Sequence, residues 1–114
     1  MFEIIRKESK YDELKRVTTE IYEFDDGTMY RYEYEYYKNN KLPAKETLYK
    51  NDELNRIIHF DEDDRIVFWQ GSGDRYTIFT YDDNYYKNKP SHEFTYENGK
   101  LVKEVHYGEE IKVA

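Results

Sequence analysis

The stretch Tyr30-Arg31-Tyr32-Glu33-Tyr34-Glu35-Tyr36 decides the fold of this chain. Tyrosines alternate strictly with charged residues, and successive side chains of an extended chain point to opposite sides. The pattern therefore predicts a β-strand with one tyrosine side and one charged side. A tyrosine ring is apolar while its hydroxyl stays in water, so the residue suits a thin sheet with one exposed side.

A second alternating run, residues 17–24, precedes this strand. The two are separated by Asp26-Gly27, which favours a type I′ hairpin turn because both central residues must take positive φ. This turn predicts that Phe24 faces Met29 and that Ile21 faces Tyr32. The apolar side of the hairpin would then hold Val17, Thr19, Ile21, Tyr30, Tyr32, Tyr34 and Tyr36, and the other side Glu20, Tyr22, Arg31, Glu33 and Glu35.

Asn98-Gly99 predicts a second hairpin near the end of the sequence, in which Tyr96 faces Leu101. This register gathers Glu93, Glu104 and His106 on one side. Carboxylates and imidazole together are the groups of a metal site or an acid–base pair. No ligand-spacing motif accompanies them, so we favour a solvated sheet surface. The same register sets Lys103 against Phe94, as at a sheet edge.

Weaker signals of the same kind fill the rest of the chain. Short runs bounded by turn residues predict strands, residues 82–89 form a polar connection, and residues 9–15 fit one helical turn. We expect one all-β domain over residues 1–114, an antiparallel meander of about 8–10 strands in an open curved sheet or a partly closed barrel. The predicted strands outside the two hairpins cover residues 2–7, 42–50, 54–60, 65–70 and 74–81.

Composition restricts the function. The net charge of −7 argues against binding to nucleic acid or an anionic membrane and favours a basic partner. The chain has no cysteine, hence no thiolate metal site, and no signal-peptide or membrane-spanning run, which together favour a cytosolic protein. No motif predicts a cofactor, a bound metal or an enzyme. We expect a monomer or a weak homodimer.

One short unit recurs: an aromatic residue, acidic or Asn/Gly turn residues, then a basic and an aliphatic residue. Residues 96–101 (YENGKL) and 60–66 (FDEDDRI) are the fullest copies. They resemble the YD-repeat hairpins of Rhs-type proteins and the Tyr-x-Asn-Gly units of MORN-like bacterial antitoxins. The resemblance implies a role as an immunity or antitoxin protein that acts beside a toxin.

Candidate partner-binding residues are the exposed acidic and aromatic side chains. An acidic loop around Asp61 lacks the alternating ligands of a calcium site and therefore indicates a surface for lysine and arginine. Trp69 would face Arg75 across a hairpin, either as an interface anchor or as an ordinary cation–π pair. The tyrosine stripe of residues 30–36 indicates a half-buried sheet face rather than a base-stacking platform. The predicted partner-binding residues are Glu33, Glu35, Asp61, Asp63, Asp64, Trp69 and Tyr85.

We therefore expect a cytosolic immunity or antitoxin protein without catalytic activity. It would neutralise a basic, nuclease-type toxin domain through an acidic, aromatic-rich surface. The alternative is a structural or small-ligand-binding β module, in which inward tyrosine hydroxyls contact a polar molecule. An enzyme that uses Glu104 or His106 is a third and weaker interpretation.

Overall fold

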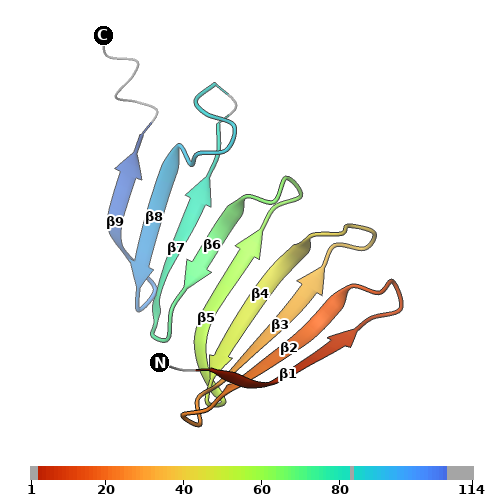
Figure 1. Ribbon diagram of the computed structural model, residues 1–114. Helices are drawn as coiled ribbons and strands as arrows, with labels where there is room; N and C mark the ends of the chain where they lie inside the picture. Colours follow the sequence, from red (N-terminus) through yellow and green to blue (C-terminus); the bar gives the residue numbers. More distant parts are fainter. Residues whose placement is uncertain (1–2, 83, 108–114) are drawn as a thin grey trace.

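The computed structural model describes residues 3–82 and 84–107, which form a single antiparallel sheet (Figure 1). Its strands follow chain order from β1 to β9, so every connection is a hairpin. Within these residues there is no helix, and thus none that could cross a membrane. The strands are β1 (Ile4–Tyr11), β2 (Val17–Phe24), β3 (Met29–Tyr36), β4 (Pro43–Lys50), β5 (Glu53–Phe60), β6 (Ile66–Gln70), β7 (Arg75–Thr80), β8 (His92–Glu97) and β9 (Lys100–His106).

The predicted all-β meander is confirmed, and the sheet is open rather than closed into a barrel. It is a single twisted layer, so neither of its sides is covered by other described residues. Only Leu48 and Ile58 among the described apolar side chains are buried, at 6% and 7% exposure, and both lie on the two central strands. A layer this thin depends on strand pairing and on half-buried aromatic rings more than on an aliphatic core.

Long loops gather at one end of the sheet and short turns at the other (Figure 1). The helical turn predicted for residues 9–15 is wrong, because β1 continues to Tyr11 and residues 12–16 form a hairpin loop. The Asp12 carboxylate causes this, since its Oδ1 accepts the backbone N–H groups of Leu14 and Arg16. A side chain that satisfies backbone donors in this way competes with helix formation.

The predicted register of the β2–β3 hairpin is wrong by one residue. Tyr22 pairs with Tyr30, and Glu20 pairs with Tyr32. The turn holds three residues, 25–27, and of these only Gly27 has positive φ, at 88°. A three-residue loop with a left-handed glycine lengthens the connection by one residue compared with a type I′ turn. Glu20 and Tyr22 consequently share a side with the tyrosines of β3.

The β8–β9 hairpin has the predicted type I′ turn, since Asn98 and Gly99 both have positive φ, and Tyr96 pairs with Leu101. A bulge at Thr95/Tyr96 then shifts the register, which was not predicted. Thr95 faces Lys103 and Glu93 faces Val105, so Glu93 lies on the opposite side from Glu104 and His106. The predicted convergence of these three groups is therefore wrong, and Lys103 does not oppose Phe94.

The same four-strand unit occurs twice, as β1–β4 and β5–β8, and β9 repeats the first strand of the unit. The bulge at Leu48/Tyr49 recurs at Thr95/Tyr96. The left-handed pair Asn51 and Asp52 recurs as Asn98 and Gly99. Residues 43–60 align without a gap on residues 90–107, with identical residues at Pro43/Pro90, Glu46/Glu93, Tyr49/Tyr96, Asn51/Asn98, Leu54/Leu101 and His59/His106.

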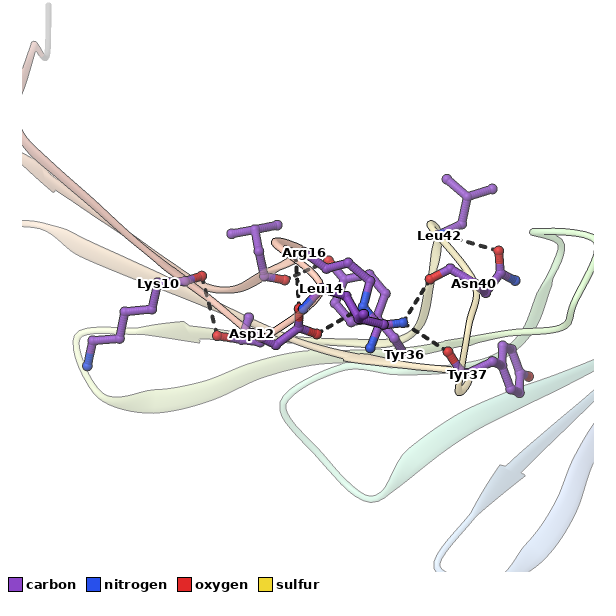
Figure 2. Close-up of polar contacts among 10 residues, drawn as sticks. Lys10, Asp12, Leu14, Arg16, Tyr36, Tyr37, Asn40 and Leu42 are labelled. Atoms are coloured by element: carbon purple, nitrogen blue, oxygen red, sulfur yellow. Dashed lines mark hydrogen bonds and ion pairs between the residues drawn. The ribbon is translucent and has the colours of Figure 1, made fainter.

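Each unit closes its long-loop end with an aspartate–arginine–tyrosine cluster, which we call a clasp. In the first clasp, Arg16 Nε lies 2.9 Å from Asp12 Oδ2, and the guanidinium lies 4.5 Å from the centre of the Tyr36 ring. Arg16 Nη1 also donates to the backbone carbonyls of Tyr37 and Asn40 (Figure 2). Arg16 thereby ties the β1–β2 loop to the β3–β4 loop.

The second clasp repeats this geometry with Asp61, Arg65 and Tyr81. Arg65 Nε lies 2.8 Å from Asp61 Oδ2 and its guanidinium 4.5 Å from the centre of the Tyr81 ring. Each tyrosine hydroxyl donates 2.6 Å to the carbonyl of the residue after the arginine, Val17 or Ile66. Arg65 Nη1 also donates to the backbone carbonyl of Lys87 in the β7–β8 loop. Each clasp therefore ties together the two long loops of its unit.

Paired residues share a side of the sheet, so the register divides the side chains into two sides. We call the side with Glu20, Tyr32, Leu48 and Ile58 the groove face, and the side with Ile21, Thr47, Phe68 and Tyr76 the ladder face. In the first unit the aromatic cluster of β2 and β3 lies on the groove face. In the second unit, a row of neighbouring aromatic rings runs along the ladder face through His59, Phe68, Tyr76 and Tyr96, and the last three of these rings are stacked.

Candidate functional site

A hollow of about 350 Å³ on the groove face of the first unit combines aromatic rings with a charged group. We call it the aromatic groove. Its walls are rings in edge-to-face contact: Tyr22 and Tyr32 have centroids 6.0 Å apart, and Phe24 and Tyr30 5.7 Å. Such pairs hold each other in place by about 0.5–1.5 kcal/mol beyond their burial. Its lining residues are Ile4, Glu20, Tyr22, Phe24, Tyr30, Tyr32 and Tyr34.

Glu20 is the carboxylate in this groove, and its side chain is only 21% exposed. Its Oε2 accepts the Tyr22 hydroxyl at 3.0 Å, and its Oε1 accepts the Tyr34 hydroxyl at 3.2 Å. Strand geometry explains this arrangement, since Tyr22 is two residues along β2 and Tyr34 lies on β3, diagonally across from Glu20. The two hydroxyls orient the carboxylate and leave each oxygen with a further acceptor site.

The tyrosine hydroxyls around Glu20 remain protonated. The hydrogen bond to Glu20 raises the pKa of Tyr22, and partial burial of the phenol adds to the increase. Burial raises the pKa of Tyr34 strongly, and the nearby charges of Glu20 and Glu46 raise it further. Both phenols therefore act as fixed hydrogen-bond donors.

Lys7 places a cationic group of the chain itself next to the Glu20 carboxylate. Lys7 Nζ on β1 lies 4.0 Å from Glu20 Oε2 and 5.5 Å from the centre of the Tyr22 ring. The Lys7 side chain is 56% exposed, so the pair is weak. Farther along the same face, Arg56 Nη2 lies 3.6 Å from Glu46 Oε1. The position of Lys7 shows that an ammonium group can lie between the Glu20 carboxylate and the Tyr22 ring.

A second hollow continues the aromatic groove toward the short-turn end of the sheet. It shares Phe24 and Tyr30 with the groove and ends at Asp26 and Lys50. Asp26 is held by the turn, because its carboxylate accepts the backbone N–H and the hydroxyl of Thr28, and these bonds lower its pKa. The groove consequently opens toward a charged carboxylate.

The short-turn end is the more acidic end of the sheet. Around the four short turns, the exposed carboxylates are Asp25, Asp26, Asp52, Glu53, Asp74 and Glu97, and the nearby cations are Lys50, Arg75 and Lys100. At the long-loop end, acidic and basic residues are balanced within the described positions: Asp12, Glu13, Asp61, Glu62, Asp63, Asp64 and Asp82 against Lys15, Arg16, Lys38, Lys41, Arg65, Lys87 and Lys89. A basic surface would therefore be attracted chiefly to the short-turn end.

The predicted partner-binding residues occupy separate places. Glu33 and Glu35 lie exposed on the ladder face of β3, away from the aromatic groove, where Glu33 pairs with Arg31 at 3.2 Å and Glu35 with Lys45 at 3.3 Å. Their exposure was predicted from the alternation. The predicted register of β2 and β3 would set Glu33 opposite Glu20, and this pair is wrong, because Glu33 pairs with Thr19.

The acidic loop has a structural member and two exposed members. Asp61 belongs to the second clasp: partial burial alone would raise its pKa, but hydrogen bonds from Arg65 and Asp63 outweigh burial and lower it. Asp63 is exposed and lies 3.5 Å from Arg65 Nη2. Asp64 is exposed with a φ of 61°. Asp63 and Asp64 remain available to a partner, whereas Asp61 is engaged.

The two predicted aromatic anchors lie at opposite ends of the second unit. Trp69 is 41% exposed on the groove face near the short-turn end. It pairs with Thr77 and not with Arg75, so that predicted pair is wrong. Tyr85 lies in the β7–β8 loop, half-buried, with its ring centre 4.5 Å from that of Tyr86. These residues do not form one surface with Glu33 and Glu35.

The three acid–base candidates do not lie on one side of the sheet. His106 Nε2 lies 2.8 Å from Glu104 Oε1 on one side of β9, and Glu93 accepts a hydrogen bond from the Tyr107 hydroxyl on the other side. His106 also lies against His92, with ring centres 4.7 Å apart. Across residues 3–82 and 84–107, no three His, Asp or Glu side chains are grouped closely enough to hold a metal ion.

Sequence reasoning missed Glu20 and Tyr22 as site residues because the register placed them on the other side. It also missed the first clasp, although a signal was present in the sequence. Residues 11–17 (YDELKRV) and 60–66 (FDEDDRI) share an aromatic–Asp start and an Arg–aliphatic end, 49 residues apart. Comparing these two segments identifies Asp12 and Arg16 as equivalents of Asp61 and Arg65.

Comparisons with known proteins found no counterpart: no family model, no curated protein and no solved structure matches this chain.

Proposed function

We propose that this protein is an immunity or antitoxin protein that binds a basic toxin domain, of nuclease type, and blocks its active surface. One observation carries the proposal: the aromatic groove is continuous with a hollow that ends at the acidic short-turn end of the sheet. Acidic groups steer a basic partner into contact, and aromatic rings then supply most of the contact energy. A single-layer sheet offers this surface without a lid or a deep pocket.

The experiment uses the full chain as bait for proteins from its native cells, in low and in high salt. We expect a basic protein to be retained at low salt and released as salt increases. The purified pair is then tested for toxin activity, which the present protein should abolish at equimolar concentration. Retention of no basic protein, or of one whose activity is unchanged in the complex, would contradict the proposal.

Charge reversal at the two ends of the sheet tests where the partner binds. The triple variant Glu53→Lys, Asp74→Lys, Glu97→Lys should slow association on the order of tenfold or more and flatten its salt dependence. The matched control Glu13→Lys, Glu62→Lys, Asp63→Lys changes the net charge equally at the long-loop end. Equal slowing by both variants would mean that only net charge matters, and a larger effect of the control would place the interface at the long loops.

A small-ligand-binding β module is the second candidate. The observation that favours it is the groove volume of about 350 Å³, which lies in the range that holds a small molecule. A thermal-shift panel of metabolites tests it. Stabilisation by one uncharged or cationic metabolite, together with no retention of any basic protein, would favour this function over toxin binding.

A further inference from the structure

The aromatic groove already accepts one cationic group. The Lys7 ammonium approaches both Glu20 Oε2, at 4.0 Å, and the face of the Tyr22 ring, at 5.5 Å from its centre. A carboxylate combined with aromatic rings is the usual protein environment for an organic cation, because the ring faces are negative and the carboxylate supplies a full charge. The chain thus contains an internal example of the ligand that fits the groove.

We propose that the aromatic groove binds a primary alkylammonium group, the end of a lysine side chain on a basic partner, with Glu20 as its counter-ion and the rings of Tyr22 and Tyr32 as its walls. The identity of the partner rests on the proposed function. The chemistry of the groove rests on its own geometry and also applies to a free alkylamine.

The fold does not require a carboxylate at position 20. Arg16 and Arg65 are equivalent, so the residue four positions later is Glu20 in the first unit and Trp69 in the second. Both lie on the groove face of the second strand of their unit, and both units have the same pairing and the same clasp. Because one unit folds with a tryptophan there, a part-buried charge in the other unit points to a ligand.

An ammonium group fits Glu20 better than a guanidinium. Arginine binds a carboxylate most strongly when both oxygens accept parallel hydrogen bonds from its planar fork. Both Glu20 oxygens already accept a tyrosine hydroxyl, from Tyr22 and from Tyr34. A compact ammonium needs only one remaining acceptor site, and its three donors adapt to the geometry. The alkyl chain of a lysine would lie along the apolar rings toward Phe24.

Lys7 does not block this site. Its side chain is more than half exposed, and exposed ion pairs at 4 Å contribute little to stability. Lys7 can rotate into water when another ammonium group arrives, because its contact with Glu20 is long, at 4.0 Å, and solvent-exposed. A ligand therefore competes with a weak internal partner, and removal of Lys7 should strengthen binding.

The test follows backbone amide NMR shifts of the ¹⁵N-labelled full chain during titration with Nα-acetyl-lysine N-methylamide. We expect saturable shifts confined to β1–β3, with a Kd on the order of 1–10 mM for one isolated side chain. The uncharged norleucine analogue should cause much smaller shifts, and the arginine analogue should bind more weakly than lysine. Equal shifts with norleucine, or no saturable shifts with lysine, would overturn the proposal.

Four variants assign the effect to the groove. Glu20→Gln should weaken lysine-analogue binding about tenfold, because it removes the charge and keeps a hydrogen-bond acceptor of the same shape. Lys7→Ala should strengthen it about two- to threefold. Glu33→Gln, a matched charge removal on the ladder face, should leave it unchanged. Tyr22→Phe serves as a second groove variant if Glu20→Gln disturbs the amide spectrum.

The same variants separate this proposal from the proposed function. If Glu20→Gln weakens the binding of both the lysine analogue and the basic partner, the groove holds a lysine of that partner. If Glu20→Gln weakens only the binding of the analogue, the groove is a site for a free amine and the partner binds elsewhere. The inference that the groove holds a lysine of the partner is then overturned. If the analogue binds while no basic partner is ever retained, the proposed function fails and the cation site stands.

Discussion

The two four-strand units have the same pattern of strands, turns and clasps, but they differ in the side of the sheet on which their aromatic residues lie. The first unit places Tyr22, Tyr30 and Tyr32 on the groove face. The second unit places Phe68 and Tyr76 on the ladder face, and its groove face carries instead the hydrogen-bonded pair Thr77 and Thr95 together with Trp69. The same pattern of strands, turns and clasps thus supports opposite arrangements of aromatic surface.

This difference shows what holds the fold together. In a two-layer protein, the side that faces the core must be apolar, and changing it would unfold the domain. Here neither side faces a second layer within residues 3–82 and 84–107, so the side on which the aromatic residues lie is free to vary between units. The elements that both units share lie at or near the ends of the strands: the clasps, the bulges and the left-handed turns. Surface chemistry can therefore diverge while the frame is kept.

The largest effect should come from the junction of the two units. Leu48 on β4 is one of the few buried apolar side chains, and Leu48→Ala should lower the free energy of unfolding by about 2–3 kcal/mol. Urea denaturation of the variant and of wild type measures this. Leu101→Ala on edge strand β9, where the side chain is 47% exposed, is the control and should cost about 0.5 kcal/mol or less. Equal costs would mean that the junction is not the core of the sheet.

The clasps should come next. Arg16→Ala and Arg65→Ala each remove charge-assisted hydrogen bonds from a side chain only 18% or 17% exposed, and each should cost about 2 kcal/mol. Because the clasps lie in different units, the double variant should be additive. Arg16→Lys and Arg65→Lys should recover little of the stability that the alanine variants lose, since lysine lacks the planar guanidinium group. A loss at one site only would mean that the clasps differ in function despite their geometry.

The equivalent turns provide a smaller test. Gly99 has a φ of 79°, and no heavy atom lies within 4 Å of an added Cβ, so Gly99→Ala should cost about 1 kcal/mol through the backbone alone. The first unit carries Asp52 at this place, with a φ of 66°. Aspartate adopts left-handed φ more readily than alanine, so Gly99→Asp should cost less than Gly99→Ala. Thermal denaturation of both variants checks this order, and the reverse order would contradict the equivalence.

The smallest effect should be the pH dependence contributed by the clasps. Hydrogen bonds from Arg16 lower the pKa of Asp12. A carboxyl whose pKa is lowered in the folded state stabilises the fold above its unfolded pKa of about 3.9, and this contribution is lost as the pH falls from there toward the folded pKa. Asp12→Asn should therefore flatten the decrease in stability below about pH 4, measured by urea midpoints at a series of pH values. Glu13→Gln in the same loop should leave the slope unchanged, and a steep slope in Asp12→Asn would contradict this role.

Much of the fold could be predicted because it is local. The alternation in residues 30–36 predicts strand β3 without help from any other residue. Asn98-Gly99 predicts a turn that the structure contains, because few residue pairs take two positive φ values in succession. The shortage of aliphatic residues agrees with a sheet whose described residues include only two buried apolar side chains.

The candidate site could not be predicted for a specific reason. The positions of Glu20 and Tyr22 relative to Tyr34 depend on whether the β2–β3 turn holds two residues or three. Sorting apolar from polar side chains selects a register only where one side is buried. Since no described residue covers either side of this sheet, the two registers are equally consistent with the composition of the strands.

The amino-acid sequence by itself thus determined the strands, most turns, the acidic charge and the absence of a large core, because these depend on neighbouring residues and on composition. Only the tertiary structure decided the registers, the two clasps and the side on which each aromatic cluster lies. Those depend on bulges and on hydrogen bonds between loops more than twenty residues apart, such as Arg16 to Tyr37. A one-residue shift in a turn moves every following side chain to the other side, and that shift placed Glu20 among the tyrosines.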